Sequence, residues 1–223
     1  MKLVLLGVSG AGKGTQAKNI IKRFNLGHIS TGAILRDHIR QKTPIGLKIQ
    51  KGIEAGQLVD DDLIIDIVKE VVKWPEFGNG YILDGFPRTL AQAIEFDGFE
   101  RIDLAVYVQV DDSVVIERLT GRLECDSCAQ MYHVKSFPPK KIGICDNCGS
   151  QLVQREDDKA ETVKERLRIF HELTDPVIDY YRNLGALFTV SGEGDVNVIT
   201  NSIMEKLDSI AEAEAKTKTQ KEV

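Results

Sequence analysis

The stretch GVSGAGKGT, residues 7–15, decides the fold of this chain. A short apolar run, residues 3–6, comes directly before it. After it, residues 17–24 carry apolar side chains at the spacing of one helix face. The stretch therefore predicts a glycine-rich turn from a buried strand into a helix, near the first residue of the chain.

The same stretch fits the phosphate-binding pattern G-x-x-x-x-G-K, with Gly7, Gly12 and Lys13 in register. Its glycines allow the backbone to curl, and the following helix start adds unpaired N–H groups and a positive dipole end. Lys13 adds a charge where β- and γ-phosphates would lie. The strict motif has Ser or Thr after the lysine, whereas here Gly14 follows and the hydroxyl comes at Thr15. The alternative is a flexible turn without function, but strand, loop, lysine and helix together favour a phosphate site.

Composition narrows the class of protein. The 223 residues suit one sizeable α/β domain with an insertion, or two small domains. The formal net charge of −5 argues against a general nucleic-acid binder. No apolar run reaches the length of a membrane span, and the first strand leaves no room for a signal peptide, so we expect a cytoplasmic protein without a membrane partner.

Strand and helix patterns alternate along the chain, which predicts a parallel sheet with right-handed crossovers and ligands at the C-terminal strand ends. Gly27 is expected to end the first helix in a left-handed conformation. Residues 125–158 are rich in Cys, Pro, Gly and polar residues, and we expect a small inserted domain there. The five expected strands are at 1–6, 28–29, 81–84, 104–110 and 187–190. Helices are expected at 13–24, from a cap at Ser30 or Thr31 to 39, from a cap at Thr43 to 56, at 63–71 after caps at Asp60 to Asp62, from a cap at Thr89 to 94, at 113–122, from 162 with a restart after Pro176, and at 196–207.

Asp84 ends an apolar strand within YILDGFPRT, residues 81–89. A carboxylate at that edge suits hydrated Mg²⁺ beside a phosphate loop, although it could simply cap a turn. Arg88 follows in the next loop and suggests a second phosphate group. Further arginines stand at loop edges, where phosphoryl transfer uses them, although each alone is more often a solvated helix charge: Arg36, Arg118, Arg122, Arg155 and Arg166.

All four cysteines lie in two Cys-x2-Cys pairs, Cys125 with Cys128 and Cys145 with Cys148. Sixteen residues separate the pairs, which is typical of a structural zinc site. A redox pair or thiols without metal are the alternatives. His133 is a lesser ligand candidate, because four cysteines already complete a tetrahedral shell.

A zinc knuckle can also bind nucleic acid or protein, with the phosphate loop then serving a regulatory NTPase. Residues 121–158 carry five basic and six acidic side chains, so the segment lacks the excess of positive charge that nucleic-acid binding requires. We therefore expect no nucleic-acid partner. A kinase for another nucleoside monophosphate would share this fold and mechanism and differ only in the base that it selects.

Several motifs, in order along the chain, resemble the signatures of adenylate kinase: HISTGAILR (28–36), GQLV (56–59), LDGFPRT (83–89) with Gln92, and QREDD (154–158). The cysteine pairs, with YHVKSFPPK (132–140) between them, resemble the subgroup with a metal-bearing lid. The resemblance implies a P-loop NTPase-like, five-stranded parallel sheet flanked by helices, with a small inserted zinc-binding lid. It divides the chain into a core (1–29, 60–120 and 159–223), an AMP-binding segment (30–59) and a lid (121–158).

The resemblance also implies the reaction MgATP + AMP ⇌ 2 ADP in a monomer whose only partners are ATP, AMP and ADP. The implied catalytic residues are Lys13, Arg88, Arg122, Arg155 and Arg166, with Asp84 holding hydrated Mg²⁺ and four cysteines holding structural Zn²⁺. Gln92 also fits chemically, since an amide can pair with an adenine edge. The implied ATP contacts are Gly10, Ala11, Gly12, Lys13, Gly14, Thr15, Arg118, Arg122, Met131, Tyr132 and Gly194; the implied AMP contacts are Thr31, Arg36, Gln57, Leu58, Val59, Gly85, Phe86, Pro87, Arg88, Gln92, Arg155 and Arg166.

Four residues depart from the commonest pattern of that family. Ser9 replaces Pro, Ala33 replaces Asp, Leu123 replaces a frequent second Arg, and Gly194 replaces a common Lys. The phosphate chemistry is untouched by these changes, and their expected effect is on nucleotide affinity and lid closure.

Overall fold

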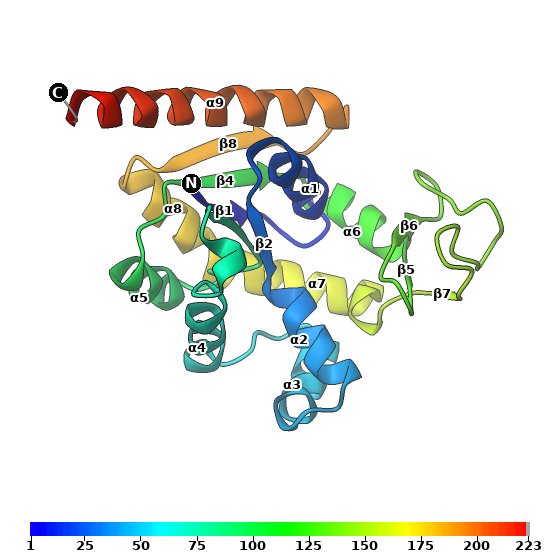
Figure 1. Cartoon of the computed structure of the whole chain (residues 1–223). Coiled ribbons are helices and arrows are strands. Elements are labelled where there is room, and N and C mark those ends of the chain that lie inside the picture. The colour runs from blue at the N-terminus through cyan, green and yellow to red at the C-terminus, as the bar shows by residue number, and fades with distance from the viewer. Residues whose placement is uncertain (222–223) are drawn as a thin grey trace.

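The computed structural model describes residues 1–221, with side chains described through Ala213. Five parallel strands form its central sheet in the order β2-β3-β1-β4-β8 (Figure 1). This confirms the predicted α/β fold. The strands are β1 (Lys2–Leu6), β2 (Gly27–Ser30), β3 (Tyr81–Asp84), β4 (Leu104–Gln109) and β8 (Leu187–Ser191).

Register brings the carboxyl ends of the central strands to one edge. Leu5 of β1 pairs with Asp84 of β3, and Leu6 pairs with Tyr107 of β4. The apolar residues of β1 and β4 are buried, as expected for strands covered on both faces. The glycine-rich loop, which follows β1, and Asp84, which ends β3, therefore lie next to each other at this edge of the sheet.

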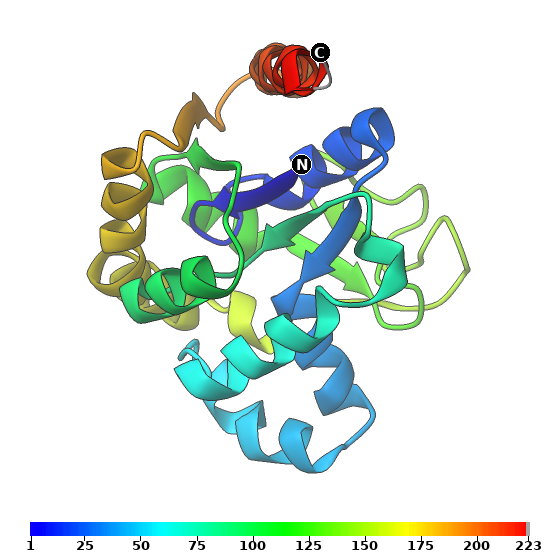
Figure 2. The same cartoon turned by 60° about the vertical axis from the view of Figure 1, so that its left-hand side comes forward.

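Helices cover both faces of this sheet (Figure 2). α1 (Lys13–Phe24) packs against α9 (Val196–Lys221) on one face, while α4 (Asp61–Val71), α5 (Leu90–Phe99) and α8 (Asp175–Asn183) line the other. The paired helices α2 (Thr31–Arg40) and α3 (Pro44–Glu54) extend away below the sheet in Figure 1. α6 (Asp112–Thr120) packs on α7 (Ala160–Ile169), and short turns of other helix types span Pro75–Phe77, Glu156–Asp158 and Phe170–Thr174.

The predicted caps explain where several helices begin. Thr43 accepts a hydrogen bond from the Gly46 N–H at 3.1 Å, and Asp60 accepts one from Leu63 at 3.3 Å. Thr89 begins α5 in the same way. Each cap satisfies a backbone donor that the first helical turn leaves without a partner.

The prediction that Gly27 ends the first helix was wrong. Asn25, with φ 52°, takes the left-handed position after α1, a conformation that Asn tolerates. Gly27 instead lies in β2, where an added Cβ would come within 2.0 Å of the Phe77 ring. Glycine is needed there for close packing and not for a turn.

Some predicted element ends also differ. α6 ends at Thr120, so Arg122 does not belong to it as predicted but begins a strand. α5 continues past residue 94 to Phe99, and α9 continues past residue 207 to Lys221. Helix ends depend on packing and on local capping, which a periodic pattern does not report.

Residues 121–158, which we call the cysteine-bearing segment, form a second, antiparallel sheet in the order β6-β5-β7. Its strands are β5 (Arg122–Cys125), β6 (Met131–His133) and β7 (Leu152–Val153). A small inserted domain was predicted here but none of its strands was, because strands of two to four residues are too short to show a visible alternation. A small cluster of four buried residues, separate from the main core, lies inside the segment: Cys125, Tyr132, Cys145 and Leu152.

Among residues 1–221, no helix combines the length and apolar character needed to cross a bilayer.

Candidate active site

The glycine-rich loop has the backbone conformation that its sequence predicts. Gly10 and Gly12 have φ of 87° and 100°, which favour glycine. At Gly7 an added Cβ would lie 2.6 Å from the carbonyl oxygen of Val108. Gly12 begins α1, and no side chain caps that helix start. Its first N–H groups and the positive end of its dipole are therefore available to an anion.

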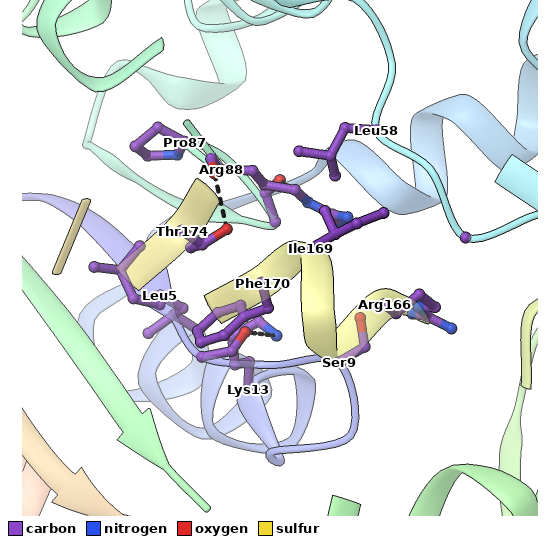
Figure 3. Close-up of a pocket in the computed structure, with 14 residues that line it drawn as sticks. Leu5, Ser9, Lys13, Leu58, Pro87, Arg88, Arg166, Ile169, Phe170 and Thr174 are labelled. Atoms are coloured by element: carbon purple, nitrogen blue, oxygen red, sulfur yellow. Dashed lines mark hydrogen bonds between the residues drawn. The ribbon is translucent and has the colours of Figure 1, made fainter. Parts of the chain in front are cut away.

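Lys13 folds back over this loop (Figure 3). Its Nζ donates to the carbonyl oxygens of Gly7 and Val8 at 2.9 and 3.0 Å. Burial lowers the pKa of Lys13 to about 8 and the charges of Arg88 and Arg166 add to this, while Asp84 opposes it. A bound phosphate would restore the charged form by supplying a counter-charge.

Asp84 lies at the end of β3, next to the loop. His28 approaches it, with Nε2 3.5 Å from Oδ2. Burial by itself would raise the pKa of Asp84, but the contact with His28 and the charge of Lys13 hold it below its usual range. Asp84 is therefore ionised at neutral pH, as a ligand of a hydrated divalent cation must be.

Two arginines converge near Lys13. Arg88 Nε donates to the carbonyl oxygen of Gly85 at 2.8 Å, and Thr174 Oγ1 donates to the carbonyl oxygen of Arg88 at 2.8 Å (Figure 3). Burial lowers the pKa of Arg88, and the nearby charge of Arg166 lowers it further. Like charges gathered in a desolvated place are costly, and an anion between them removes that cost.

Two adjoining cavities meet at these arginines. The empty space in the first is about 500 Å³ and in the second about 610 Å³, including the open solvent at their mouths. Ser9, Lys13, Phe170 and Thr174 line only the first, while Thr31, Arg36, Gln57, Val59 and Gln92 line only the second. Five residues line both: Gly56, Leu58, Gly85, Arg88 and Arg166. Pro87 also lines the first cavity, and Phe86 is buried beside it in the main core.

Carboxylates orient the remaining arginines of the predicted site. Arg122 donates from Nε and Nη2 to the fully buried Asp158 at 2.7 and 2.5 Å. Arg166 Nη1 donates to the carbonyl oxygen of Asp157 at 2.8 Å and lies 3.3 Å from Asp158 Oδ1. The bidentate pair with Asp158 fixes the guanidinium plane of Arg122, whereas Arg166 is held through Nη1 alone.

Arg155 pairs with Glu124 of β5, and both side chains are mostly buried. Burial and the charge of Arg155 lower the pKa of Arg36 to about 10, which leaves Arg36 charged at neutral pH. The two like charges repel one another, which shows that α2 and the cysteine-bearing segment lie within electrostatic reach of one another.

The other predicted nucleotide contacts lie in different surroundings. Arg118 donates to the carbonyl oxygen of Gly192 at 2.9 Å and faces those of Gly10 and Ala11, so it connects the phosphate loop to the turn before α9. Met131 Sδ accepts from Arg155 at 3.6 Å. Tyr132 is buried among the cysteines and lines neither cavity. The roles of Met131, Tyr132 and Gly194 beside ATP stay predictions.

The four departures from the family pattern have clear positions. Ser9 lines the first cavity, as Figure 3 shows. Leu123 packs against the small core of the cysteine-bearing segment. The Ala33 N–H donates to Ser30 at 3.4 Å, and Gly194 has φ of 100°.

Several polar residues that contact the predicted site residues were not predicted from the sequence. Asp61, Glu124 and Thr174 each contact a predicted site residue, but none of them belongs to a quoted motif. His28, which approaches Asp84, stood in the quoted HISTGAILR run without a predicted role. Asp158 stood in the quoted QREDD run, where a carboxylate close to Arg155 was the available signal.

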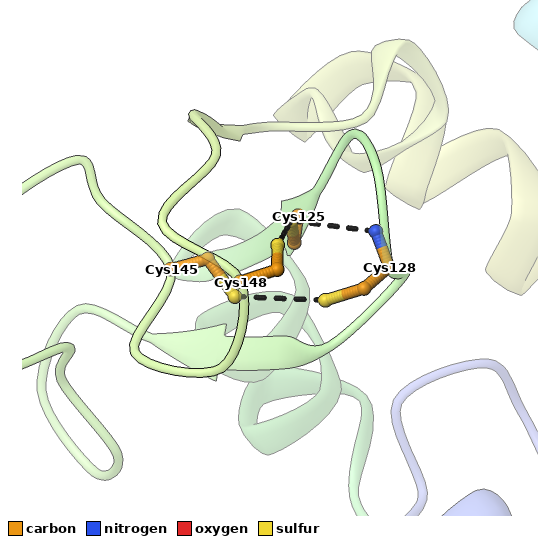
Figure 4. A group of neighbouring side chains, drawn as sticks. All are labelled: Cys125, Cys128, Cys145 and Cys148. Carbon is orange, nitrogen blue, oxygen red and sulfur yellow. Dashed lines mark hydrogen bonds between the residues drawn. The ribbon is translucent and has the colours of Figure 1, made fainter.

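The four cysteines meet as their spacing predicts (Figure 4). Their sulfur atoms all lie within 4.8 Å of one another, with Cys125 and Cys148 3.4 Å apart and Cys128 and Cys145 3.6 Å apart. A tetrahedral zinc site with Zn–S bonds of about 2.3 Å has sulfurs about 3.8 Å apart. The donor set therefore fits a structural zinc ion.

Comparison with known proteins agrees with this geometry. The adenylate kinase family model matches residues 5–186. A curated adenylate kinase from Caldicellulosiruptor saccharolyticus is 45% identical over 212 residues, covering 93% of this chain and 99% of the relative. One from Clostridium perfringens is 46% identical over 214 residues, covering 94% and 99%. One from Clostridium botulinum is 44% identical over 208 residues, covering 91% and 96%. With its phosphate loop, paired cavities and converging arginines, the chain belongs to the adenylate kinase family of nucleoside monophosphate kinases.

Proposed function

We propose that this chain transfers the γ-phosphoryl group of MgATP directly to AMP, forming two ADP. One observation carries the proposal: Arg88 and Arg166 line two adjoining cavities at once. The first cavity contains Lys13 and adjoins the glycine-rich loop, which suits the phosphates of ATP. The second contains Thr31, Arg36 and Gln92 and suits AMP. A group bound between the two arginines would face both nucleotides.

The proposed mechanism is in-line transfer without a phosphoenzyme. Charge develops on the equatorial oxygens of the transferring group, and fixed cations stabilise it. Lys13, Arg88 and Arg166 supply these cations, and Arg122 and Arg155 join them from the cysteine-bearing segment. Asp84 would hold hydrated Mg²⁺, which neutralises phosphate charge when bound.

We further propose that residues 121–158 are a lid, residues 30–59 an AMP-binding segment and the remainder the core. The proximity of Arg36 and Arg155 supports this, because their like charges, one from each outer part, would both face an anion bound between them. Zinc on the four cysteines would be purely structural, since four thiolates leave no open coordination position. We also propose that the protein acts as a monomer, with ATP, AMP and ADP as its substrates.

The test is a coupled kinase assay with MgATP and each of AMP, GMP, CMP, UMP and dTMP as acceptor. We expect AMP to give the highest kcat/KM. Preference for another nucleotide would leave phosphoryl transfer intact but overturn the base assignment. No turnover with any acceptor would overturn the proposed function as a whole.

A further inference from the structure

The carboxylate of Asp61 lies outside both cavities and contacts Gln92, which lines the second cavity. Asp61, in the first turn of α4, accepts a hydrogen bond at Oδ1 from Gln92 Nε2 at 2.6 Å. Its Oδ2 accepts from Thr89 Oγ1 at 2.8 Å. Asp61 does not line either cavity, so it does not contact the proposed nucleotides there.

The opposite atom of the Gln92 amide is also fixed. Its Oε1 accepts from the backbone N–H of Arg88 at 2.7 Å. A carboxylate can only accept a hydrogen bond and a backbone N–H can only donate one, so the two partners allow a single amide orientation. Gln92 is 2% exposed, and a flipped amide would leave buried polar atoms facing partners of the wrong kind.

Thr89 closes this arrangement into a ring. Its hydroxyl accepts from the backbone N–H of Gln92 at 3.2 Å while it donates to Asp61. Because α4 and α5 pack together, both ends of the ring stand on the same rigid pair of helices. The position of the Asp61 carboxylate is therefore set independently of any nucleotide.

Amide orientation matters for the choice of base. Adenine presents a donor at N6 beside a ring-nitrogen acceptor, so it needs an amide oxygen opposite N6 and an amide N–H beside it. Hypoxanthine and guanine carry the acceptor O6 at the same place. Gln92 Nε2 keeps a second N–H and Oε1 keeps a second lone pair, so the orientation of the amide decides which purine it matches.

We propose that Asp61 is a specificity-determining positioning residue, which locks the Gln92 amide in the orientation that favours a 6-amino purine over a 6-oxo purine. The inference rests on the proposed function, because it assigns the second cavity to the acceptor nucleotide. It adds a residue from another helix to base selection and predicts a change in preference, not only a loss of affinity.

The experiment compares kcat/KM for AMP and IMP, which differ in the donor and acceptor pattern at this purine edge. Asp61→Asn is isosteric and supplies either a donor or an acceptor to Gln92, so the AMP-to-IMP ratio should fall about tenfold, as the loss of one charge-assisted hydrogen bond permits. Asp61→Ala removes the acceptor without adding a donor, and it should lower the ratio in the same direction.

Asp62→Asn is the matched control. It removes the same charge from the same helical turn, but Asp62 is exposed, so the AMP-to-IMP ratio should stay at its wild-type value. An unchanged ratio in folded Asp61→Asn or Asp61→Ala would overturn the inference, as would equal losses for AMP and IMP. If the wild-type protein does not use AMP, the proposed function fails first, and that result is visible before any variant is made.

Discussion

The phosphate-loop site and the cysteine-bearing segment are organised in opposite ways. The site stands on the large core of the parallel sheet, and its cations Lys13, Arg88 and Arg166 come from distant parts of the chain. The segment has only four buried residues in its own core, and all four potential metal ligands lie within residues 125–148. The arrangement of the first region depends on tertiary packing, whereas the proposed zinc ion would stabilise the second as a local cross-link.

This difference separates what a substitution should damage in each region. A change in the cation cluster should affect turnover while the core keeps the fold intact. A change in the cysteine cluster should affect folding of the segment, because so small an apolar core cannot stabilise it alone.

The largest expected effect is on stability, from Cys145→Ser combined with Cys148→Ser. The double variant should lose its metal and lower the melting temperature, since a structural zinc site contributes several kcal/mol or more to folding. Turnover at moderate temperature should largely survive while the segment remains folded. Metal analysis should find about one zinc per wild-type chain.

Ser127→Ala is the control, because this exposed residue lies between the first two cysteines and the substitution removes only its hydroxyl, which donates to the neighbouring Asp126. The structural role of zinc would be contradicted if the wild-type protein bound no metal in the absence of chelator. It would also be contradicted if metal removal abolished turnover without changing circular dichroism or nucleotide binding.

The second effect is on turnover. Arg88→Lys keeps a positive charge but loses the planar fork that donates to Gly85 and faces both cavities. We expect kcat to fall about a hundredfold, or about 3 kcal/mol, with little change in melting temperature. Arg101→Lys, at an exposed position, should change neither. A kcat of wild-type size in Arg88→Lys would remove this residue from the mechanism.

A smaller effect should come from the contact that couples the two regions. Glu124→Gln removes the carboxylate that orients Arg155, so KM for the nucleotides should rise several-fold, as expected for the loss of about 1 kcal/mol. Glu117→Gln is the matched control, because Glu117 pairs with Lys135 where both side chains are more than half exposed. Equal KM values in the two variants would show that Glu124 is not needed to orient Arg155 toward the nucleotides.

The last prediction concerns the pH dependence of stability and of ADP binding. Lys13 has a folded-state pKa of about 8 against an ordinary value of 10.5. Between these two pH values Lys13 holds a proton in the unfolded chain but has released it in the nucleotide-free folded chain. The free energy of unfolding should therefore increase as the pH rises from about 8 to 10.5. Affinity for ADP should fall over the same window, because the uncharged amine binds phosphate weakly.

Calorimetric titration of ADP at pH 8.5, in buffers of different ionisation enthalpy, measures the proton that Lys13 takes up on binding. We expect net proton uptake, roughly half a proton or more by the titration of a group with this pKa. Lys13→Met should abolish the uptake. Binding without proton exchange in the wild-type protein would contradict the lowered pKa.

Short-range signals explain why much of the fold could be predicted. The glycine-rich loop, the capping residues Thr43 and Thr89 and the apolar run 104–110 each act within a few residues, so they can be read directly. Gly27 was misread because its requirement comes from Phe77, fifty residues away. The strands of the second sheet were missed because they are too short to show a period.

By itself the sequence determined the parallel α/β fold, the phosphate loop and the clustering of the four cysteines, because short local patterns encode all three. Only the tertiary structure decided that Arg88 and Arg166 line two cavities at once and that Asp158 holds Arg122. It also decided that Asp61 fixes the amide of Gln92. These contacts join residues that are close in space through the register of strands and the packing of helices, and no local pattern in the chain records that proximity.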